Sequence, residues 1–233
     1  MISLKNIVHD FDDLLYPHTC AACAEVIGKN EKVFCAQCQV EIPKTDFHTH
    51  DKNQFYERLW GRFPFNYSLS FFWQEKGNKT QHLLHELKYR DRTQAGLAVG
   101  KWYGEILSAV RHNILNADII VPVPLHAKKK HQRGYNQSDF FAEGLSESMQ
   151  ISWRADAVAR IKETGSQTRK NKYQRWENVR DIFEVKKPEL LENKHVILVD
   201  DVVTTGSTLE GCAKKILEVS GSSISLITIA MAH

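Results

Sequence analysis

The chain has 233 residues, of which 42% are hydrophobic and 25% are charged, and its formal net charge is +3. This composition is ordinary for a globular protein, and the length suffices for one sizeable α/β domain with a small module beside it. No run of about 18 apolar residues occurs, which excludes a helical membrane span, and so small a net charge does not by itself indicate a nucleic-acid partner.

The first fifteen residues interleave charged and apolar side chains at helical spacing. They lack the uninterrupted apolar segment and the small-residue cleavage site of a signal peptide. We therefore expect a cytoplasmic protein.

Four of the five cysteines form two C-x2-C pairs separated by eleven residues, namely Cys20, Cys23, Cys35 and Cys38. This spacing is typical of a four-thiolate zinc site made of two knuckles. Two disulfides or an iron site are the alternatives, although a cytoplasmic location argues against disulfides. We predict structural zinc in a zinc-ribbon-like module over residues 1–45, because so small a module cannot bury a core without a metal.

Pro43, Gly61, Pro64 and a polar stretch at 44–53 follow, and we interpret residues 46–65 as a linker to a second domain over residues 66–233. Aromatic residues dominate 66–73, which predicts a strand. Thr80 is a suitable N-cap for the next helix, whose apolar face carries Leu83, Leu84 and Leu87. This helix runs into a basic patch at 88–92. A second helix over about 95–110 is predicted to bury Leu97, Trp102, Ile106, Leu107 and Val110.

Residues 118–123 predict a strand that ends at Pro122 and Pro124, because two prolines do not fit the middle of a sheet. The loop predicted at 126–138 contains four Lys or Arg residues and Gly134, which permits a backbone turn. Ligands gather beyond the carboxyl ends of parallel strands, so this loop is a candidate anion site; a solvated basic loop is the alternative. Ser138 is the predicted N-cap of a helix that carries Phe140, Phe141 and Leu145.

The segment 160–180 concentrates positive charge: seven Lys or Arg residues against two Glu give +5, more than the +3 of the whole chain. Tyr173 and Trp176 stand among these charges. Three interpretations are open, namely a flap over a polyanionic substrate, a surface for single-stranded nucleic acid, and a solvated loop. Strands are predicted at 157–162, 182–185, 196–199 and 224–230, and Cys212 is predicted to pack in the core.

The most informative stretch is 194–208, in which a buried apolar strand ends in the adjacent carboxylates Asp200 and Asp201. A hydroxyl-rich loop, 204–208, then leads into a helix. The N–H groups of such a loop and the positive end of the helix dipole suit a phosphate. The acid pair repels a phosphate and suits sugar hydroxyls or a metal ion. The pattern predicts a ribose 5-phosphate site, and an ordinary strand–loop–helix unit with incidental acids is the alternative.

This stretch resembles the motif with which type I phosphoribosyltransferases bind 5-phosphoribosyl 1-pyrophosphate (PRPP). The resemblance implies that the acids hold the ribose 2′- and 3′-hydroxyls and have a catalytic role, while the loop holds the 5′-phosphate. The residues so assigned to PRPP are Asp200, Asp201, Val203, Thr204, Thr205, Gly206, Ser207 and Thr208. The implied fold is a type I phosphoribosyltransferase-like parallel sheet flanked by helices, with Mg²⁺ bound alongside PRPP.

Further motifs resemble the ComF, or competence protein F, family over nearly the full length. They are the four cysteines, Leu87-Lys88-Tyr89, residues 121–125, Arg133-Gly134-Tyr135-Asn136-Gln137, Gln167, Arg175, Asn178-Val179, Phe183 and residues 199–208. One departure is Asp181-Ile182, where the family often has Gly-Ala. The resemblance implies pyrophosphate or flap contacts from Pro124, Leu125, Arg133, Asn136, Gln137 and Arg175. It also implies a link to the uptake of single-stranded DNA, with that DNA and a protein of the uptake machinery as partners.

Two functional hypotheses follow. The first is a PRPP-binding ComF-type protein that handles single-stranded DNA in competence. The second is an active phosphoribosyltransferase that transfers phosphoribosyl from PRPP to an unidentified acceptor in nucleotide metabolism. Purine salvage is disfavoured, because Thr204 stands where salvage enzymes of this class often carry an Asp base.

Overall fold

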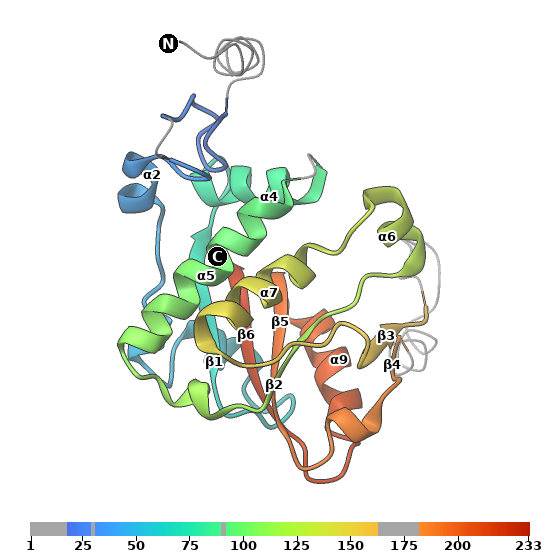
Figure 1. The fold of residues 1–233 in the computed structure, drawn as a ribbon. Helices are drawn as coiled ribbons and strands as arrows, with labels where there is room; N and C mark the ends of the chain where they lie inside the picture. Colours follow the sequence, from blue (N-terminus) through green and yellow to red (C-terminus); the bar gives the residue numbers. More distant parts are fainter. Residues whose placement is uncertain (1–17, 29–30, 90–91, 163–181) are drawn as a thin grey trace, which may run out of the picture.

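The computed structural model describes residues 18–28, 31–89, 92–162 and 182–233. Its centre is a four-stranded parallel sheet with the order β1-β6-β5-β2, formed by β1 (Ser68–Gln74), β2 (Ile119–Pro122), β5 (His195–Val203) and β6 (Ser223–Ala232) (Figure 1). Every residue from 224 to 231 is buried, so both faces of the sheet are covered. This double coverage explains the continuous apolar runs in the sequence, and the predicted α/β class is confirmed.

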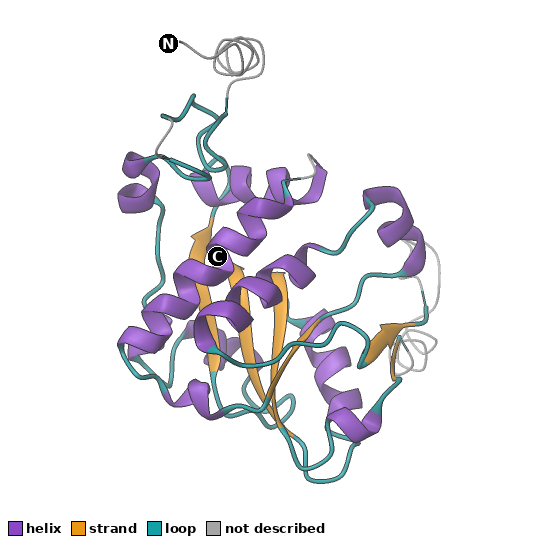
Figure 2. Ribbon diagram, viewed as in Figure 1, coloured by secondary structure: helices purple, strands orange, loops and turns teal. Residues whose placement is uncertain are grey.

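Two long helices, α5 (Thr93–Ala109) and α7 (Gln137–Met149), lie side by side over one face of the sheet (Figure 2). Their backbones are in contact. A Cβ added to Gly144 would lie 2.2 Å from the carbonyl oxygen of Leu97, and one added to Gly100 would lie 2.4 Å from that of Phe141. Only glycine permits so close an approach at these two positions.

The predicted buried face of α5 is only partly correct. Leu107 is buried, whereas Leu97, Trp102 and Ile106 are half-buried and Val110 is 52% exposed. Because α7 comes so close, the face of α5 that is buried consists mainly of small side chains. It is formed by Ala95, Gly96, Val99, Gly100, Tyr103, Gly104 and Leu107.

The helix α4 (Lys79–Tyr89) buries Leu83, Leu84 and Leu87, as predicted. Its N-terminal cap is Asn78 and not Thr80. The Oδ1 atom of Asn78 accepts a hydrogen bond of 2.9 Å from the N–H of Gln81, while Thr80 lies within the helix with its side chain buried.

The predicted cap of α7 is wrong by two residues, because Asn136 occupies the N-cap position and Ser138 lies within the helix. The prediction of a loop over 126–138 is also wrong, since it contains the helix α6 (Ala127–Arg133). The side chain of His126 accepts from the N–H of Lys128 at one end, and Gly134 ends the helix at φ +79°. Lys, Arg and Gln are good helix formers, so a short capped helix is favourable here.

The segment 46–65, interpreted above as a linker, contains η1 (Phe47–Thr49) and α3 (Gln54–Leu59), and it follows α2 (Ala36–Glu41). Phe55 and Leu59 are fully buried. The side chain of Asn53 donates to the carbonyl oxygen of Ser68 at 2.9 Å and accepts from the N–H groups of Phe55 and Tyr56. This segment is therefore packed against β1. The domain boundaries themselves stay a prediction.

The remaining elements complete the frame around the sheet. A separate antiparallel pair is formed by β3 (Val158–Arg160) and β4 (Phe183–Val185), and η2 (Asn113–Asn116) and η3 (Pro188–Leu190) precede β2 and β5. The helix α9 (Ser207–Ile216) follows β5 and buries Cys212, as predicted. Among the helices of the described ranges, none combines the length and the apolarity that crossing a bilayer requires.

Candidate functional site

The two adjacent carboxylates lie near the end of β5, because that strand continues through Asp200 and Asp201 to Val203. The Oδ1 atom of Asp200 accepts a hydrogen bond of 3.2 Å from the hydroxyl of Ser138 and one of 2.9 Å from the N–H of Asp201. The Oδ2 atom of Asp201 forms an ion pair of 3.0 Å with Nζ of Lys88. Three elements far apart in sequence, α4, α7 and β5, therefore meet at the acid pair.

The two carboxylates have different electrostatic surroundings. Burial and then the neighbouring charge of Asp201 raise the pKa of Asp200 to about 7, although hydrogen bonds and the charge of Lys88 oppose the rise. Asp201 has a cation within 3.0 Å, whereas Asp200 accepts from neutral donors. Carboxyl groups perturbed in this way are typical of functional sites. A ligand or cation that needs an ionised Asp200 must displace its proton below neutral pH.

The hydroxyl-rich loop, residues 204–208, lies directly after β5. Thr204, Thr205, Ser207 and Thr208 are exposed, and Val203 is buried beneath them. Gly206 has φ +77° and stands at the N-cap position of α9, which has 10 residues. The loop thus presents hydroxyls and the first N–H groups of a helix beside the acid pair. Such an arrangement can bind a phosphate group.

Two arginines, one in α3 and one just after it, hold the backbone of this loop. They were not predicted from the sequence, because they fall in the segment interpreted as a linker. Nη1 of Arg58 donates to the carbonyl oxygen of Thr204 at 2.8 Å, and Nη1 of Arg62 donates to that of Thr205 at 2.5 Å. The sequence offers no signal for this contact, because Arg62 lies beyond the end of α3 at Leu59 and does not share a helical face with Arg58. Lys88 was also missed as a partner of the acid pair.

The residues predicted to contact pyrophosphate lie in several environments. Pro124, Leu125 and Arg133 are half-buried, and Asn136 and Gln137 are buried. Nδ2 of Asn136 donates to the carbonyl oxygen of Val123 at 3.1 Å, and the hydroxyl of Tyr135 donates to that of Leu87 at 2.7 Å. The Arg-Gly-Tyr-Asn-Gln motif thereby ties the ends of β2 and α4 to the start of α7. Its contact with pyrophosphate stays a prediction.

Most of the basic segment at 160–180, including Arg175, Tyr173 and Trp176, lies outside the described residues. At its start, the guanidinium of Arg160 lies 5.5 Å from the centre of the Phe183 ring, on the other strand of the β3–β4 pair. Burial lowers the pKa of Arg160, and the nearby charge of Asp200 opposes that effect. This basic side chain is therefore close enough to the acid pair to influence it.

The four predicted metal ligands lie together at the start of the chain. Their sulfur atoms all lie within 4.8 Å of one another, and we call Cys20, Cys23, Cys35 and Cys38 the cysteine cluster. All four are free thiols, so the disulfide alternative is not observed. Although burial opposes it, N–H groups that donate to the Cys20 sulfur lower the pKa of that thiol to about 7. Burial raises the pKa of the Cys23 and Cys38 thiols, so it is the close approach of the four sulfur atoms that suits a metal such as zinc.

Side chains of α4 and of Arg92, just beyond it, hold the segment around the cysteine cluster. Nδ1 of His82 lies 3.2 Å from the carbonyl oxygen of Ala21, and Nη1 of Arg92 donates to that of Thr19 at 2.8 Å. Glu86 is almost fully buried between them and forms an ion pair of 3.1 Å with Arg92. Because Lys88 lies in the last turn of the same helix, α4 connects the cysteine cluster with the acid pair.

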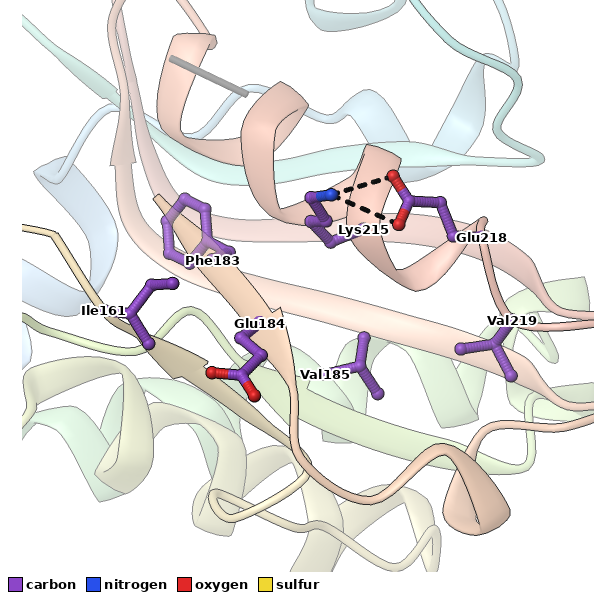
Figure 3. Close-up of a pocket in the computed structure, with 7 residues that line it drawn as sticks. All are labelled: Ile161, Phe183, Glu184, Val185, Lys215, Glu218 and Val219. Atoms are coloured by element: carbon purple, nitrogen blue, oxygen red, sulfur yellow. Dashed lines mark hydrogen bonds and ion pairs between the residues drawn. The ribbon is translucent and has the colours of Figure 1, made fainter. Parts of the chain in front are cut away.

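A pocket of about 420 Å³ opens elsewhere, between the β3–β4 pair and α9 (Figure 3). Its lining includes Ile161, Phe183 and Val185 on one side, with Lys215 and Glu218 joined by an ion pair of 3.0 Å on the other. Among the residues that the structure describes, no site residue predicted from the sequence lines this pocket. The predicted site lies elsewhere, at the end of β5, where the side chains of the hydroxyl-rich loop are exposed.

Comparisons with known proteins bear on this surface. The family model of the phosphoribosyl transferase domain matches residues 140–233, which contain β5, the hydroxyl-rich loop and α9. The DNA utilization protein YhgH of Escherichia coli O157:H7 is 28% identical over 212 residues, which cover 88% of this chain and 86% of that protein. Competence protein F of Haemophilus influenzae is 34% identical over 145 residues, 61% of each chain.

This chain is a relative of the ComF proteins. The resemblance predicted from its sequence is confirmed: the chain is similar to ComF proteins, residues 140–233 match the phosphoribosyl transferase domain, and the cysteine cluster could bind a metal such as zinc. Among solved structures, a glutamine PRPP amidotransferase from B. subtilis has a TM-score of 0.44 and 18% identity, over 63% of this chain and 30% of that chain.

Proposed function

We propose that this ComF-type protein binds PRPP, or another ribose 5-phosphate ligand, at the end of β5. The proposal is carried by the acid pair that stands directly before an exposed hydroxyl-rich loop at the start of α9. Asp200 and Asp201 would accept hydrogen bonds from the ribose 2′- and 3′-hydroxyls. The loop N–H groups and hydroxyls would donate to the 5′-phosphate, which carries the charge that a helix N-terminus favours.

The pyrophosphate group of PRPP would extend from the acid pair toward basic side chains. Lys88 is the cation nearest to Asp201 among the described residues, and Arg133 and Arg175 are the further candidates. We propose that Mg²⁺ accompanies PRPP, because a divalent ion neutralises the pyrophosphate that the carboxylates would otherwise repel. Omission of Mg²⁺ should then weaken binding of PRPP more than binding of ribose 5-phosphate.

Isothermal titration calorimetry with PRPP and Mg²⁺ tests the site. The double substitution Asp200→Ala/Asp201→Ala should weaken binding by roughly 100-fold or more, because it removes charged hydrogen-bond acceptors. Asp156→Ala is the matched control, since Asp156 is exposed and pairs with Arg154 and Lys187 away from β5. An affinity of the double variant equal to that of the wild type would refute the assignment.

We propose further that the protein handles single-stranded DNA, with a protein of the uptake machinery as partner. Support comes from relatives named DNA utilization protein and competence protein F, and from the +5 charge of residues 160–180. Binding of a labelled oligonucleotide should weaken steeply as salt rises, because phosphate contacts release counterions. If the labelled oligonucleotide does not bind even at low salt, this part of the proposal is wrong.

Phosphoribosyl transfer is the second candidate function, because the acid pair would lie beside the ribose carbon that reacts. The acceptor nucleophile would form a bond to C1′ and lose its proton to solvent, while the bond from C1′ to pyrophosphate breaks and pyrophosphate leaves with the electron pair. The carboxylates would stabilise the positive charge on the ring. Release of pyrophosphate from PRPP and Mg²⁺ across nucleobases, amines and single-stranded DNA tests it. Tight binding without turnover would favour the binding role.

For the cysteine cluster we propose structural zinc, since four thiolates complete a tetrahedron and leave no position for a substrate. Metal analysis of the purified protein should give about one zinc ion per chain. We also propose a cytoplasmic location, where thiols stay reduced and available to the metal. Iron in place of zinc would overturn the metal assignment.

A further inference from the structure

The loop proposed to hold the 5′-phosphate rests on a platform contributed by α3 and the turn after it. Arg58 donates to the carbonyl oxygens of Thr204 and Ala232 at 2.8 and 2.6 Å, and Arg62 donates to that of Thr205 at 2.5 Å. These contacts join residues that are more than 140 positions apart in sequence. They bind the backbone of the loop and leave its hydroxyls exposed.

The packing between these polar contacts leaves the loop little freedom. A Cβ added to Gly206 would lie 2.4 Å from Cδ2 of Leu59, and Leu59 is fully buried. Gly206 has φ +77°, a conformation that favours glycine. The loop is thus held on the side that faces α3 by three contacts: the packing of Gly206 on Leu59 and the hydrogen bonds from Arg58 and Arg62.

The direction of the carbonyl groups determines the direction of the amides. In a planar trans peptide, the C=O and the following N–H point to opposite sides of the chain. The carbonyl groups of Thr204 and Thr205 point to the arginines, so the N–H groups of Thr205 and Gly206 point away from them. Within the described ranges, neither N–H donates a hydrogen bond to another group. Two unused donors therefore face the open side of the loop.

The charge of the platform also favours an anion. Arg58 is half-buried, and its hydrogen-bond partners are neutral carbonyl groups. Within the described part of the chain it forms no ion pair, whereas Arg62 pairs with Glu210 at 2.8 Å. The positive charge of Arg58 is therefore not cancelled by an acidic partner, and it lies behind the two amides. An anion that accepts from those amides gains from this charge as well.

We propose that Arg58 and Arg62 are positioning residues for the 5′-phosphate, an inference that rests on the proposed ribose 5-phosphate site. They act through the loop. Their hydrogen bonds hold the carbonyl groups of Thr204 and Thr205 toward α3, and the N–H groups of Thr205 and Gly206 therefore point toward the phosphate. Arg58 contributes more, because its charge is not paired with an acid. The phosphate site therefore extends to residues of the segment 46–65.

Calorimetric titration of ribose 5-phosphate into the full-length protein tests this inference. Arg58→Met should weaken binding roughly tenfold, Arg62→Met less, and Arg58→Lys should restore part of the loss because it keeps one donor and the charge. Arg154→Met is the matched control, since the side chain of Arg154 is 43% exposed and pairs with Asp156. Urea unfolding identifies variants that do not fold. If Arg58→Met does not fold, the affinity of Arg58→Lys for ribose 5-phosphate, compared with that of the wild type, tests the inference instead.

Amide chemical shifts provide a readout that a merely structural role would not move. In the wild type, ribose 5-phosphate should shift the N–H resonances of Thr205 and Gly206, and in a folded Arg58→Met these shifts should be much smaller at equal saturation. Equal affinity and equal shifts in Arg58→Met and wild type would overturn the positioning role while leaving the site itself intact. If the wild type binds neither PRPP nor ribose 5-phosphate, the proposed function fails and this inference fails with it.

Discussion

Replacing Asp200 by Asn should stabilise the folded protein at pH 8 although it damages the proposed binding site. The amide oxygen of Asn can still accept from the hydroxyl of Ser138 and from the N–H of Asp201, as the carboxylate does. What the substitution removes is a negative charge that is partly desolvated and that lies next to Asp201. Functional sites often retain such charges at the expense of stability.

The pH dependence follows from the raised pKa of Asp200, about 7 in the folded protein against an ordinary value of 3.8. Between these two values the folded state binds more protons than the unfolded state, so stability falls as pH rises through this window. At about 1.4 kcal/mol per pH unit, the full loss is about 4 kcal/mol, and roughly 3 kcal/mol of it falls between pH 5 and pH 8. Because Asp200 as a whole residue is only half-buried, we expect a smaller loss of about 1–2 kcal/mol over that interval.

Urea unfolding of wild type and Asp200→Asn at pH 5 and pH 8 measures this difference, and effects of pH on the cysteine cluster cancel between the two proteins. Asp201→Asn is a comparison variant, which removes the neighbouring charge that raises the pKa of Asp200 and should therefore make the stability less dependent on pH than in the wild type. It should destabilise the protein by about 1 kcal/mol at pH 8, because it removes the partner of the partly buried Lys88. A stability difference between Asp200→Asn and wild type that does not grow from pH 5 to pH 8 would refute the reasoning.

Three further predictions concern the ligand, the helices and the metal. The affinity for PRPP should rise between pH 6 and pH 8, because the proton held by Asp200 below a pKa of about 7 must leave when the carboxylate binds; calorimetry in buffers of different ionisation enthalpy will detect its release. Gly144→Ala should destabilise the fold by about 1–3 kcal/mol in urea unfolding, since its Cβ would meet the Leu97 carbonyl oxygen, although Ala is favoured in an isolated helix. Chelation of the metal should lower the urea midpoint, and added zinc should restore it.

The local chemistry of the site could be predicted from the sequence. The acid pair, the hydroxyl-rich loop and the two C-x2-C pairs each lie within a few residues, so their spacing alone indicates a ribose 5-phosphate site and a metal site. The strands β5 and β6 were also predictable, because burial on both faces requires continuous apolar runs.

The contacts among distant segments could not be predicted in the same way. The face of α5 that is buried is decided by the backbone of α7, and large apolar side chains such as Val110 lie outside that contact. The helix α6 was missed because a basic stretch between Pro124 and Gly134 has no apolar periodicity to indicate a helix. Thr80 and Ser138 were named as caps because residue type favours capping without specifying which candidate is used.

The sequence by itself determined which chemical groups stand beside one another along the chain: two carboxylates before a loop of hydroxyls, and four thiols in two pairs. Only the tertiary structure decided which groups surround them. Lys88 reaches Asp201 because the last turn of α4 lies beside the end of β5. Arg58 reaches the loop because α3 lies against it. The physical reason is that hydrogen bonds and ion pairs act over about 3 Å. Residues more than 100 positions apart come within that distance only when the core has brought their helices and strands together.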